Sequence, residues 1–315
     1  MAKKKMILDL DTGVDDVLAI AYALATPDAD LIGIVSSYGN TLVDIAGENS
    51  LKMLEQFGAP DVPVFIGHSH SSDTESFETM EISKQIHGQR GLGAVELPLA
   101  KRAVEEQHGV DFIIEAAHKY ADDLVIVPTG PLTNLADAMQ KDPEIADLIG
   151  NITIMGGALT IPGNVTAYTE ANINQDPKAA DYVFRNAKML VMVGLDVTMK
   201  TLLTKNETQQ WRELGTDKGV IMADIFDFYI DAYRDLGIDE RGAALHDPLA
   251  VGVAVDPALV SLFPINMMVD HEDGRTIGDP KRLLDPVKNN YAAIDVDEDF
   301  YLERFMNYMA IVLGK

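Results

Sequence analysis

Four aspartates near the start of the chain are the residues best suited to chemistry. Residues 9–16 read DLDTGVDD, so Asp9, Asp11, Asp15 and Asp16 fall within eight consecutive positions. Carboxylates packed this closely raise one another's pKa unless a cation neutralises them. Because Gly13 allows a tight turn between them, the carboxylates of Asp11 and Asp16 are expected to face one point. The pattern predicts a divalent cation held by oxygen ligands.

The ligand types favour a hard cation. Carboxylates suit Ca²⁺ and Mg²⁺, and Ca²⁺ is the better fit where a backbone carbonyl joins the ligand set. Zinc is disfavoured because the chain has no Cys and no paired His ligands. The segment also lacks the Gly and Glu of an EF-hand loop, which excludes that class.

Further polar residues follow the ends of apolar runs later in the chain. SSYGN, PTGPLTN, MGG and GLDVT each end a short β-type run, and LHDPLA opens a late helix. In an open parallel α/β sheet, ligands bind outside the carboxyl ends of the strands. These segments are therefore expected to gather polar side chains on one rim: Asp9, Asp11, Asp15, Asp16, Asn40, Thr129, Asn134, Asn164, Glu170, Asn172, Asp196, His246 and Asp247.

Taken singly, several of these residues are also typical of helix starts. Asp15 and Asp16 fall in a first helical turn, where the helix dipole favours anions. Asp176 and Asp247 each precede a proline, as helix caps do. The gathering at one rim, rather than any one residue, favours a functional site.

The rim depends on an alternation of strands and helices. Apolar runs such as KMILDL, LVIVPTG and NITIMGGA alternate with helical patterns over residues 14–26, 42–57 and 109–121. Near-continuous apolar strands separated by helices predict an α/β fold, with an open, mostly parallel sheet (a Rossmann-like core) flanked by helices. Residues 68–97 read as an irregular acidic stretch and residues 207–236 as helical. Without a linker or a repeat, residues 1–315 are expected to form a single domain.

Net charge and hydropathy limit the classes of molecule that this protein is expected to bind. The 50 acidic and 25 basic residues give a net charge of −25, which repels phosphate backbones and anionic lipids. Nucleic acid and membrane are therefore not expected as partners. No apolar run approaches the roughly 18 residues of a membrane span. The start, MAKKKMILDLDTG, has no signal-peptide core, so a cytoplasmic location is expected.

Seven segments together carry a family resemblance. LDLDTGVDD, SSYGN, HGQRGLG, VPTGPLTNLA, IMGGA, TEANINQDPKAA and LHDPLAV occur in that order between residues 8 and 251. The set resembles the inosine-uridine nucleoside hydrolase family (nucleoside N-ribohydrolases). The resemblance implies the nucleoside hydrolase fold and Ca²⁺-dependent hydrolysis of the N-glycosidic bond of purine or pyrimidine ribonucleosides for salvage. It also implies a small-molecule nucleoside as partner and a homo-oligomer, either a dimer or a tetramer.

The resemblance assigns the metal and the catalytic base. It implies that Ca²⁺ is held by Asp11, Asp16, Asp247 and the main-chain carbonyl of Thr129, together with a water and two ribose hydroxyls. Asp11 is then the general base that deprotonates the water.

The resemblance also assigns the residues around the sugar. Asp15 and Asn172 would accept or share hydrogen bonds with ribose hydroxyls. Asn164 and Glu170 would hold the 5′-hydroxyl, and Asn40 would help position the water and the metal.

Around the nucleobase, the resemblance implies two histidines and leaves other residues open. His246 is the candidate acid and His87 lies beside the base. Tyr229 and Tyr233 are suited either to stacking on the base or to packing in the core. Ala171 stands where family members often carry a Phe, which predicts a roomier pocket.

The expected chemistry agrees with these residue types. N-glycosidic cleavage passes through an oxocarbenium-like sugar, so negative charge around the ribose stabilises the positive charge that develops. A metal-bound water is more acidic than bulk water, so a carboxylate suffices as its base. A histidine is able to protonate the departing base.

Two other functions compete with this interpretation. DLDTG after a strand is also similar to the nucleophile motif of haloacid-dehalogenase-type phosphatases, in which the first Asp becomes phosphorylated. Gly13 stands where that motif has Thr or Val, and the rim is acidic. The second alternative is a non-catalytic nucleoside- or calcium-binding protein, although every expected ligand and the expected base are present.

Overall fold

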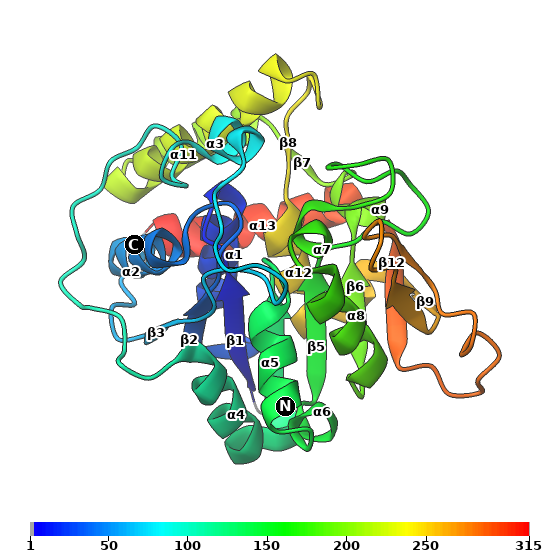
Figure 1. Ribbon diagram of the computed structural model, residues 1–315. Coiled ribbons are helices and arrows are strands. Elements are labelled where there is room, and N and C mark those ends of the chain that lie inside the picture. Colours follow the sequence, from blue (N-terminus) through cyan, green and yellow to red (C-terminus); the bar gives the residue numbers. More distant parts are fainter. Residues whose placement is uncertain (1–2, 315) are drawn as a thin grey trace.

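An eight-stranded sheet forms the centre of the protein. We describe a computed structural model that covers residues 3–314 (Figure 1). In spatial order the sheet contains β3 (Val64–Ile66), β2 (Ala29–Ser36), β1 (Lys4–Leu10), β4 (Leu124–Pro128), β5 (Asn151–Met155), β6 (Leu190–Val193), β12 (Asn290–Val296) and β9 (Val260–Pro264). Neighbouring strands are parallel except β9, which pairs antiparallel with β12. The expected mostly parallel α/β sheet is confirmed.

The central strand β1 shows why these segments are strands. Residues 6–10 are buried without interruption, since the strand has a partner on each side and helices above and below. β1 aligns Asp9 with Val35 of β2 and with Pro128 of β4. A continuous apolar run is what a strand covered on both faces requires.

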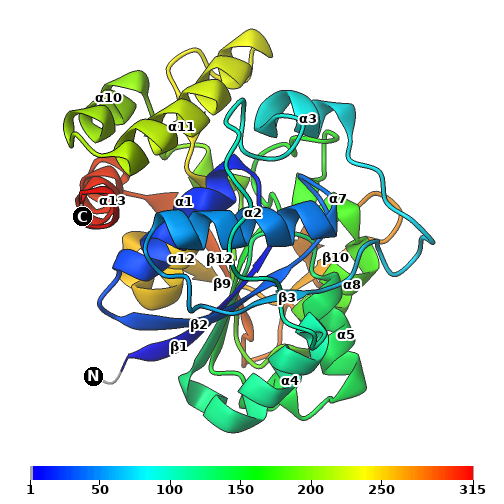
Figure 2. The same cartoon turned by 90° about the vertical axis from the view of Figure 1, so that its left-hand side faces the viewer.

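Helices cover both faces of the sheet, as the two views show (Figures 1 and 2). The hydrophobic cores on the two faces are separate. One face carries α1 (Val14–Ala25), α2 (Val43–Gln56), α12 (His246–Val255) and α13 (Glu298–Leu313). The other carries α4 (Gly109–Tyr120), α5 (Thr133–Lys141), α6 (Ile145–Leu148) and α8 (Pro177–Asn186).

Helix α1 is apolar on nearly every side. Residues 14–23 are all buried, because α1 lies between the sheet, α12 and α13. A helix that is apolar all round is one that is enclosed. Enclosure fixes the orientation of its first turn, which carries Asp15 and Asp16.

A smaller layer stands above the carboxyl ends of the strands. It contains α3 (Glu81–His87), α10 (Lys205–Glu213) and α11 (Asp217–Asp235), and α3 packs against α11. The prediction of an irregular stretch over residues 68–97 missed α3. The predicted helix over residues 207–236 is divided in two at Gly215, whose φ of +70° does not continue a helix.

Short elements complete the described chain. They are α7 (Ala171–Gln175), α9 (Leu195–Thr198), the 3-10 turns Ala121–Asp123 and Pro257–Leu259, the ribbon of β7 (Leu202–Leu203) and β8 (Ala243–Ala244), and the ribbon of β10 (Met267–Val269) and β11 (Thr276–Gly278). Within residues 3–314, no helix is both long and apolar enough to cross a bilayer.

Candidate active site

Three buried carboxylates converge at the carboxyl end of β1. Asp15, Asp16 and Asp247 each place a carboxylate oxygen within 4.8 Å of the others. Asp15 and Asp16 lie in the first turn of α1, and Asp247 lies in the first turn of α12, which packs against α1. The contact between the two helices therefore brings the start of the chain and residue 247 together.

The carboxylates differ in their hydrogen bonds. Asp16 accepts from the backbone N–H of Gly13 at 2.8 Å and from the Thr129 hydroxyl at 2.7 Å. Among the described residues, Asp15 Oδ1 and Asp247 Oδ2 are buried without a hydrogen-bond partner. A buried oxygen without a partner is costly, so these two atoms indicate where a ligand would bind.

Asp11 lies beside this group and is held by Asn40. The backbone N–H of Asn40 donates to Asp11 Oδ2 at 2.7 Å, and its side-chain amide donates to Asp11 Oδ1 at 3.1 Å. The same amide reaches Asp16 Oδ2 at 3.4 Å, so Asn40 connects the two carboxylates.

Burial without a cation makes these acids weak. Burial, and next the charge of Asp16, raises the pKa of Asp15 to about 8. The pKa values of Asp11 and Asp247 are raised well above their ordinary value, mainly by burial and then by neighbouring carboxylates. An oxygen-only set with unsatisfied lone pairs and mutual repulsion fits a hard divalent cation.

The main-chain carbonyl of Thr129 is a hydrogen-bond acceptor at this site. The Asn172 amide donates to it at 2.7 Å and to the carbonyl of Met155 at 3.1 Å. Asn172 belongs to α7, so its side chain joins the ends of β4 and β5. The amide and the carbonyl line the same cavity as Asp15 and Asp247.

Glu170 and Asn164 line the cavity, and both accept backbone hydrogen bonds. Glu170 caps α7 by accepting from the N–H groups of Asn172 at 2.9 Å and Ile173 at 3.1 Å. Asn164 is exposed, and its side-chain oxygen accepts from the N–H of Ala171 at 3.0 Å. These bonds fix both side chains on the wall next to α7.

His87 ends α3 and is buried above the first turn of α1. The backbone N–H of Val14 donates to His87 Nδ1 at 3.2 Å, so Nδ1 is unprotonated and the proton resides on Nε2. Burial lowers the pKa of His87 to about 3, which keeps the ring neutral at pH 7. Its ring centroid is 5.3 Å from that of Tyr229.

His246 is the centre of a chain of hydrogen bonds. Its Nε2 lies 2.7 Å from the Tyr233 hydroxyl and its Nδ1 lies 2.7 Å from the Thr198 hydroxyl. The Tyr233 hydroxyl lies 3.2 Å from that of Tyr229. Burial lowers the pKa of His246 to about 4, so the free site holds a neutral imidazole between two hydroxyl groups.

These groups surround a cavity of about 410 Å³. Its floor carries Asp15, Asp247 and Asn172, and the two histidines and two tyrosines lie along one side. The outer wall is apolar and comes mainly from the layer above the sheet. Its side chains are Met80, Ile82 and Ile86 at α3 and Leu236 and Ile238 just after α11, together with Met199 just after α9. A cavity with an acidic floor and an apolar, aromatic wall suits a ligand with a polyhydroxyl end and a flat, weakly polar end.

Some residues predicted for the rim have structural partners instead. Asp9 accepts from the Asn134 amide at 2.8 Å, and neither residue lines the cavity. Asp196 accepts from the backbone N–H groups of Leu159 and Thr160 at 2.9 and 2.7 Å. Asp9, Asn134 and Asp196 therefore hold the strand ends and loops that carry the site.

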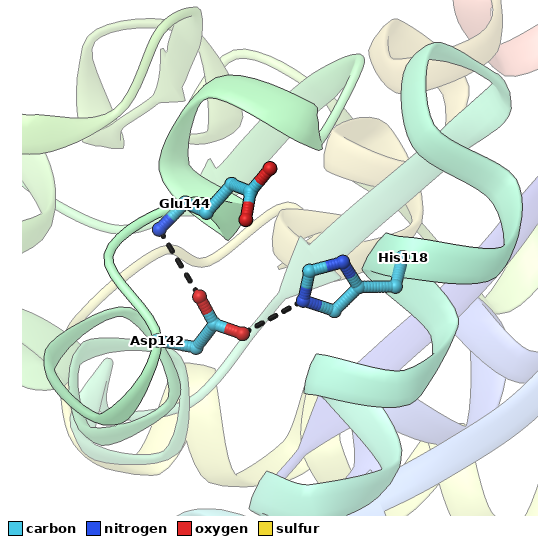
Figure 3. A group of neighbouring side chains, drawn as sticks. All are labelled: His118, Asp142 and Glu144. Atoms are coloured by element: carbon cyan, nitrogen blue, oxygen red, sulfur yellow. Dashed lines mark hydrogen bonds and ion pairs between the residues drawn. The ribbon is translucent and has the colours of Figure 1, made fainter.

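A second acidic group lies on the surface, away from the cavity. His118 Nε2 is 2.7 Å from Asp142 Oδ2, and the N–H of Glu144 donates to Asp142 Oδ1 at 3.2 Å (Figure 3). The hydrogen bond to Asp142 raises the pKa of His118. His118 lies on α4 and Asp142 directly follows α5, so this ion pair connects two helices.

The sequence interpretation missed Thr198 and the apolar wall. Thr198 ends the segment GLDVT, in which the sequence pattern predicts only Asp196 as a site residue. Met80, Ile82 and Ile86 recur at two- and four-residue spacing within a polar stretch. This recurrence was the available signal for α3, and it is short enough to be ambiguous.

Comparison with known proteins agrees with this geometry. A sequence model of the family described as inosine-uridine preferring nucleoside hydrolase matches residues 6–303. Probable uridine nucleosidase 2 of Arabidopsis thaliana is 37% identical over 262 residues, which cover 82% of this chain and 79% of that protein. Pyrimidine-specific ribonucleoside hydrolase RihA of Shigella boydii is 33% identical over 95% of this chain and 96% of its own.

A solved structure is more similar still. The purine-preferring ribonucleoside hydrolase from Gardnerella vaginalis is 54% identical, covers 99% of both chains and superposes with a TM-score of 0.97. The haloacid-dehalogenase alternative is therefore wrong. The chain belongs to the inosine-uridine preferring nucleoside hydrolase family and is a ribonucleoside-hydrolysing enzyme.

Proposed function

We propose that this enzyme is a Ca²⁺-dependent ribonucleoside hydrolase that releases a free nucleobase and ribose, with purine ribonucleosides as its preferred substrates. The observation that carries the proposal is the pair of buried, unpartnered oxygens, Asp15 Oδ1 and Asp247 Oδ2, on the floor of a cavity with an aromatic wall. At one point in the cavity these oxygens are able to act as ligands of a cation and as hydrogen-bond acceptors for sugar hydroxyls.

The residues that would hold Ca²⁺ are Asp11, Asp16, Asp247 and the carbonyl of Thr129, with Asp15 adjacent. Buried carboxylates and a carbonyl are the oxygen donors that this ion prefers. The bound ion would lower the pKa of a water and offset the repulsion among the carboxylates.

In this mechanism Asp11 accepts the proton of the attacking water. Asn40 donates to both oxygens of Asp11 and so orients the carboxylate. Asp15 accepts from a ribose hydroxyl, and Asn172 lies across the floor to fix the sugar. As the glycosidic bond breaks, the surrounding carboxylates stabilise the positive charge that develops on the ribose.

The departing base takes up a proton from the opposite wall. Because His87 carries its proton on Nε2, it is a neutral hydrogen-bond donor above the first turn of α1. The chain of hydroxyls and imidazole through Tyr229, Tyr233 and His246 supplies a second route for a proton. Neutral donors suit a site whose buried carboxylates must keep their negative charge for the sugar.

The substrate preference is inferred from the wall and from the similar structures. A two-ring base covers more of an apolar and aromatic wall than a one-ring base does. The structural neighbour with 54% identity is described as purine-preferring. The relatives with 37% and 33% identity are described as a probable uridine nucleosidase and a pyrimidine-specific ribonucleoside hydrolase. Ala171, the first residue of α7, lines the cavity, and its small side chain leaves space that a bulkier residue would fill.

The test is base release from inosine, guanosine, adenosine, uridine and cytidine. Each substrate is assayed after dialysis against EDTA and after return of Ca²⁺ or Mg²⁺. We expect release that requires the ion, recovers best with Ca²⁺ and is fastest with a purine. Full activity after EDTA would contradict the metal assignment, and faster release of pyrimidines would contradict the preference.

A matched pair of variants tests the assignment of Asp11 as the general base. Asp11→Ala removes the carboxylate, whereas Asp61→Ala changes an exposed aspartate far from the cavity. We expect Asp11→Ala to lower kcat by about 10²–10⁴-fold with the fold intact, and Asp61→Ala to have no effect. Near-normal turnover by a folded Asp11→Ala enzyme would exclude Asp11 as the base.

A further inference from the structure

The loop between β5 and α7, residues 156–170, carries two polar residues that line the cavity. These are Asn164 and Glu170. The side-chain oxygen of Asn164 accepts from the N–H of Ala171 at 3.0 Å, which fixes the orientation of the amide. Within residues 3–314 the amide nitrogen of Asn164 makes no hydrogen bond. Its two N–H groups are therefore free to donate to a ligand.

Thr169 connects the two cavity residues of this loop. Its carbonyl accepts from the N–H groups of Val165 at 3.1 Å and Thr166 at 3.4 Å, the two residues that follow Asn164. Thr169 also directly precedes Glu170 in the chain, and it is fully buried. A displacement of Thr169 therefore moves both polar residues of this wall.

The turn between β10 and β11 packs closely against Thr169. The Thr169 hydroxyl donates to the carbonyl of Asp273. Gly274, at a φ of +70°, passes so near that an added Cβ would lie 2.7 Å from Thr169 Cγ2. Non-bonded carbons pack about 3.5–4.0 Å apart, so only glycine fits at this contact. Within the described structure no residue of 267–278 lines the cavity, so the turn acts on the loop from outside the site.

Arg275 contacts both sides of this junction. Its guanidinium carbon lies 3.9 Å from the centre of the Tyr168 ring, which is a cation–π contact. The same guanidinium donates through Nη2 to Asp273 Oδ2 at 2.9 Å, and the backbone N–H of Arg275 donates to Asp273 Oδ1 at 3.0 Å. Arg275 therefore joins the residue before Thr169 to the residue whose carbonyl Thr169 contacts.

The hairpin of β10 and β11 is itself fixed to α8. The buried Asp181 of α8 accepts from the N–H of Val269 at 3.0 Å, and its other oxygen lies 3.0 Å from His271 Nε2. Figure 2 shows β10 beside α8, and the two elements are in contact. The loop of residues 156–170 thus rests on a support that is anchored to the main body of the protein.

The place of this loop determines which part of a ribonucleoside it meets. This step rests on the proposed function, in which vicinal ribose hydroxyls bind at the acidic floor and the base lies along the aromatic and apolar wall. The 5′-hydroxyl is the sugar group that neither surface binds, and the wall next to α7 is the polar surface that is left. The free N–H groups of Asn164 suit the oxygen of that hydroxyl.

We propose that Arg275 is a positioning residue for substrate binding, which acts through the loop and does not touch the substrate. Arg275 and the β10–β11 turn hold Tyr168 and Thr169, and Thr169 holds Asn164 where its amide donates to the 5′-hydroxyl. Loss of the Arg275 side chain should therefore weaken recognition of the 5′-hydroxyl selectively. Hydrolysis of a substrate without that hydroxyl should be insensitive to the change.

The test compares base release from inosine with base release from 5′-deoxyinosine, which lacks the hydroxyl. For the wild-type enzyme we expect kcat/KM to be about three- to tenfold higher for inosine, the effect of one neutral hydrogen bond. Arg275→Ala should bring the two values to within about twofold of each other by lowering the value for inosine. Arg102→Ala is the matched control and should leave the ratio unchanged. Arg102 is 37% exposed and pairs with Glu105, as Arg275 is 41% exposed and pairs with Asp273.

The other partner of the cation–π contact provides a second variant. Tyr168→Ala should reproduce the loss, and Arg275→Ala/Tyr168→Ala should be no worse than either single variant, because all three remove the same contact. Tyr168→Phe keeps the aromatic ring and should keep the wild-type ratio. If Arg275→Ala lowers kcat/KM for both substrates by the same factor, or for neither, the positioning role is overturned.

The outcomes separate this inference from the proposed function. A wild-type enzyme that releases no base from any ribonucleoside would refute the function, and the inference with it. A wild-type enzyme that releases base normally but has equal kcat/KM for inosine and 5′-deoxyinosine would leave the function standing. That second result would overturn the placement of Asn164 and, with it, the role of Arg275.

Discussion

Removing divalent ions and then raising the pH should destabilise the protein. The perturbation acts on four buried carboxylates: Asp11, Asp15 and Asp247 of the active site, and Asp9, which does not line the cavity. Burial raises the pKa of Asp15 to about 8 and that of Asp9 to about 7. The pKa values of Asp11 and Asp247 are also raised well above their ordinary value by burial. The metal-free folded state therefore holds protons that the unfolded chain has already released.

The sign of the effect follows from this difference. A group whose folded pKa is above its unfolded value stabilises the protein fully below the unfolded pKa, near 4 for an aspartate. That stability is lost as the pH rises through the folded pKa. His87 and His246 have lowered pKa values, about 3 and about 4, so their contribution is lost only as the pH falls below about 6.5. The interval from pH 6.5 to 8 therefore isolates the carboxylates.

The magnitude can be worked from Asp15 and Asp9. Each carboxyl group that is protonated in the folded state but ionised in the unfolded chain lowers the free energy of unfolding by about 1.4 kcal/mol for every unit by which the pH rises. Between pH 6.5 and 8, Asp15 and Asp9 together lower the free energy of unfolding by about 2–3 kcal/mol. For 315 residues and an unfolding entropy of about 2.1 cal/mol/K per residue, Tm falls by roughly 3–5 °C.

The assay is thermal and urea unfolding of EDTA-treated protein at about pH 6.5, 7.25 and 8, which are the two ends and the middle of the interval in which the carboxylates titrate. Saturating Ca²⁺ should remove the part of the pH dependence that comes from the active-site carboxylates, because the ion replaces their protons, and should leave the smaller part that comes from Asp9. Without calcium, Asp15→Asn should reduce the slope, whereas Asp61→Asn, an exposed control, should leave it unchanged. Metal-free stability that is flat or rises over this interval, or a slope that Asp15→Asn leaves unchanged, would refute the reasoning.

Three further predictions concern single side chains. Tyr233→Phe removes the hydroxyl next to His246 and should lower kcat by about 10²-fold with little change in KM; equal kcat values would exclude the hydroxyl from proton delivery. Asp247→Asn should weaken Ca²⁺ binding at least about 10–100-fold in calorimetry, and unchanged affinity would remove Asp247 from the ligand set. Gly13→Ala brings a Cβ within 2.5 Å of His87 Nδ1. It should therefore lower the free energy of unfolding, measured by urea titration, by about 1–3 kcal/mol. An unchanged free energy of unfolding would mean that His87 moves freely.

Most of the sheet was predictable, because parallel strands that are buried on both faces consist of continuous runs of apolar residues. β1, β4, β5 and β6 are each buried along almost their whole length. The start of α12 was predictable from Pro248 in its first turn. Helix α3 was not, since it presents only a few apolar side chains to α11 and the cavity. Its formation depends on a partner more than 130 residues later in the chain.

The hydrogen-bonding partners within the site were less predictable than the site itself. The sequence left Tyr233 open between base stacking and core packing, and the structure gives it a third role. It is buried, it is hydrogen-bonded to His246, and it lines the cavity. Thr198, the last residue of α9, completes the same chain. Such partners follow from helix packing, which spacing in the sequence does not encode.

The aspartates illustrate the same limit most clearly. Residue type and spacing place four of them at one strand end, yet only Asp15 and Asp16 share a point with Asp247. The reason is that α1 begins at Val14 and α12 at His246, so these three carboxylates occupy the first turns of two packed helices. Two helix N-termini offset part of the negative charge, typically by 0.3–1 kcal/mol or about 2 kcal/mol at most for each group. Raising the pKa of one aspartate from 3.8 to about 8 reflects a penalty on the order of 6 kcal/mol. The dipoles alone are therefore too weak to hold the group ionised at neutral pH, and the cation proposed above would supply the missing stabilisation.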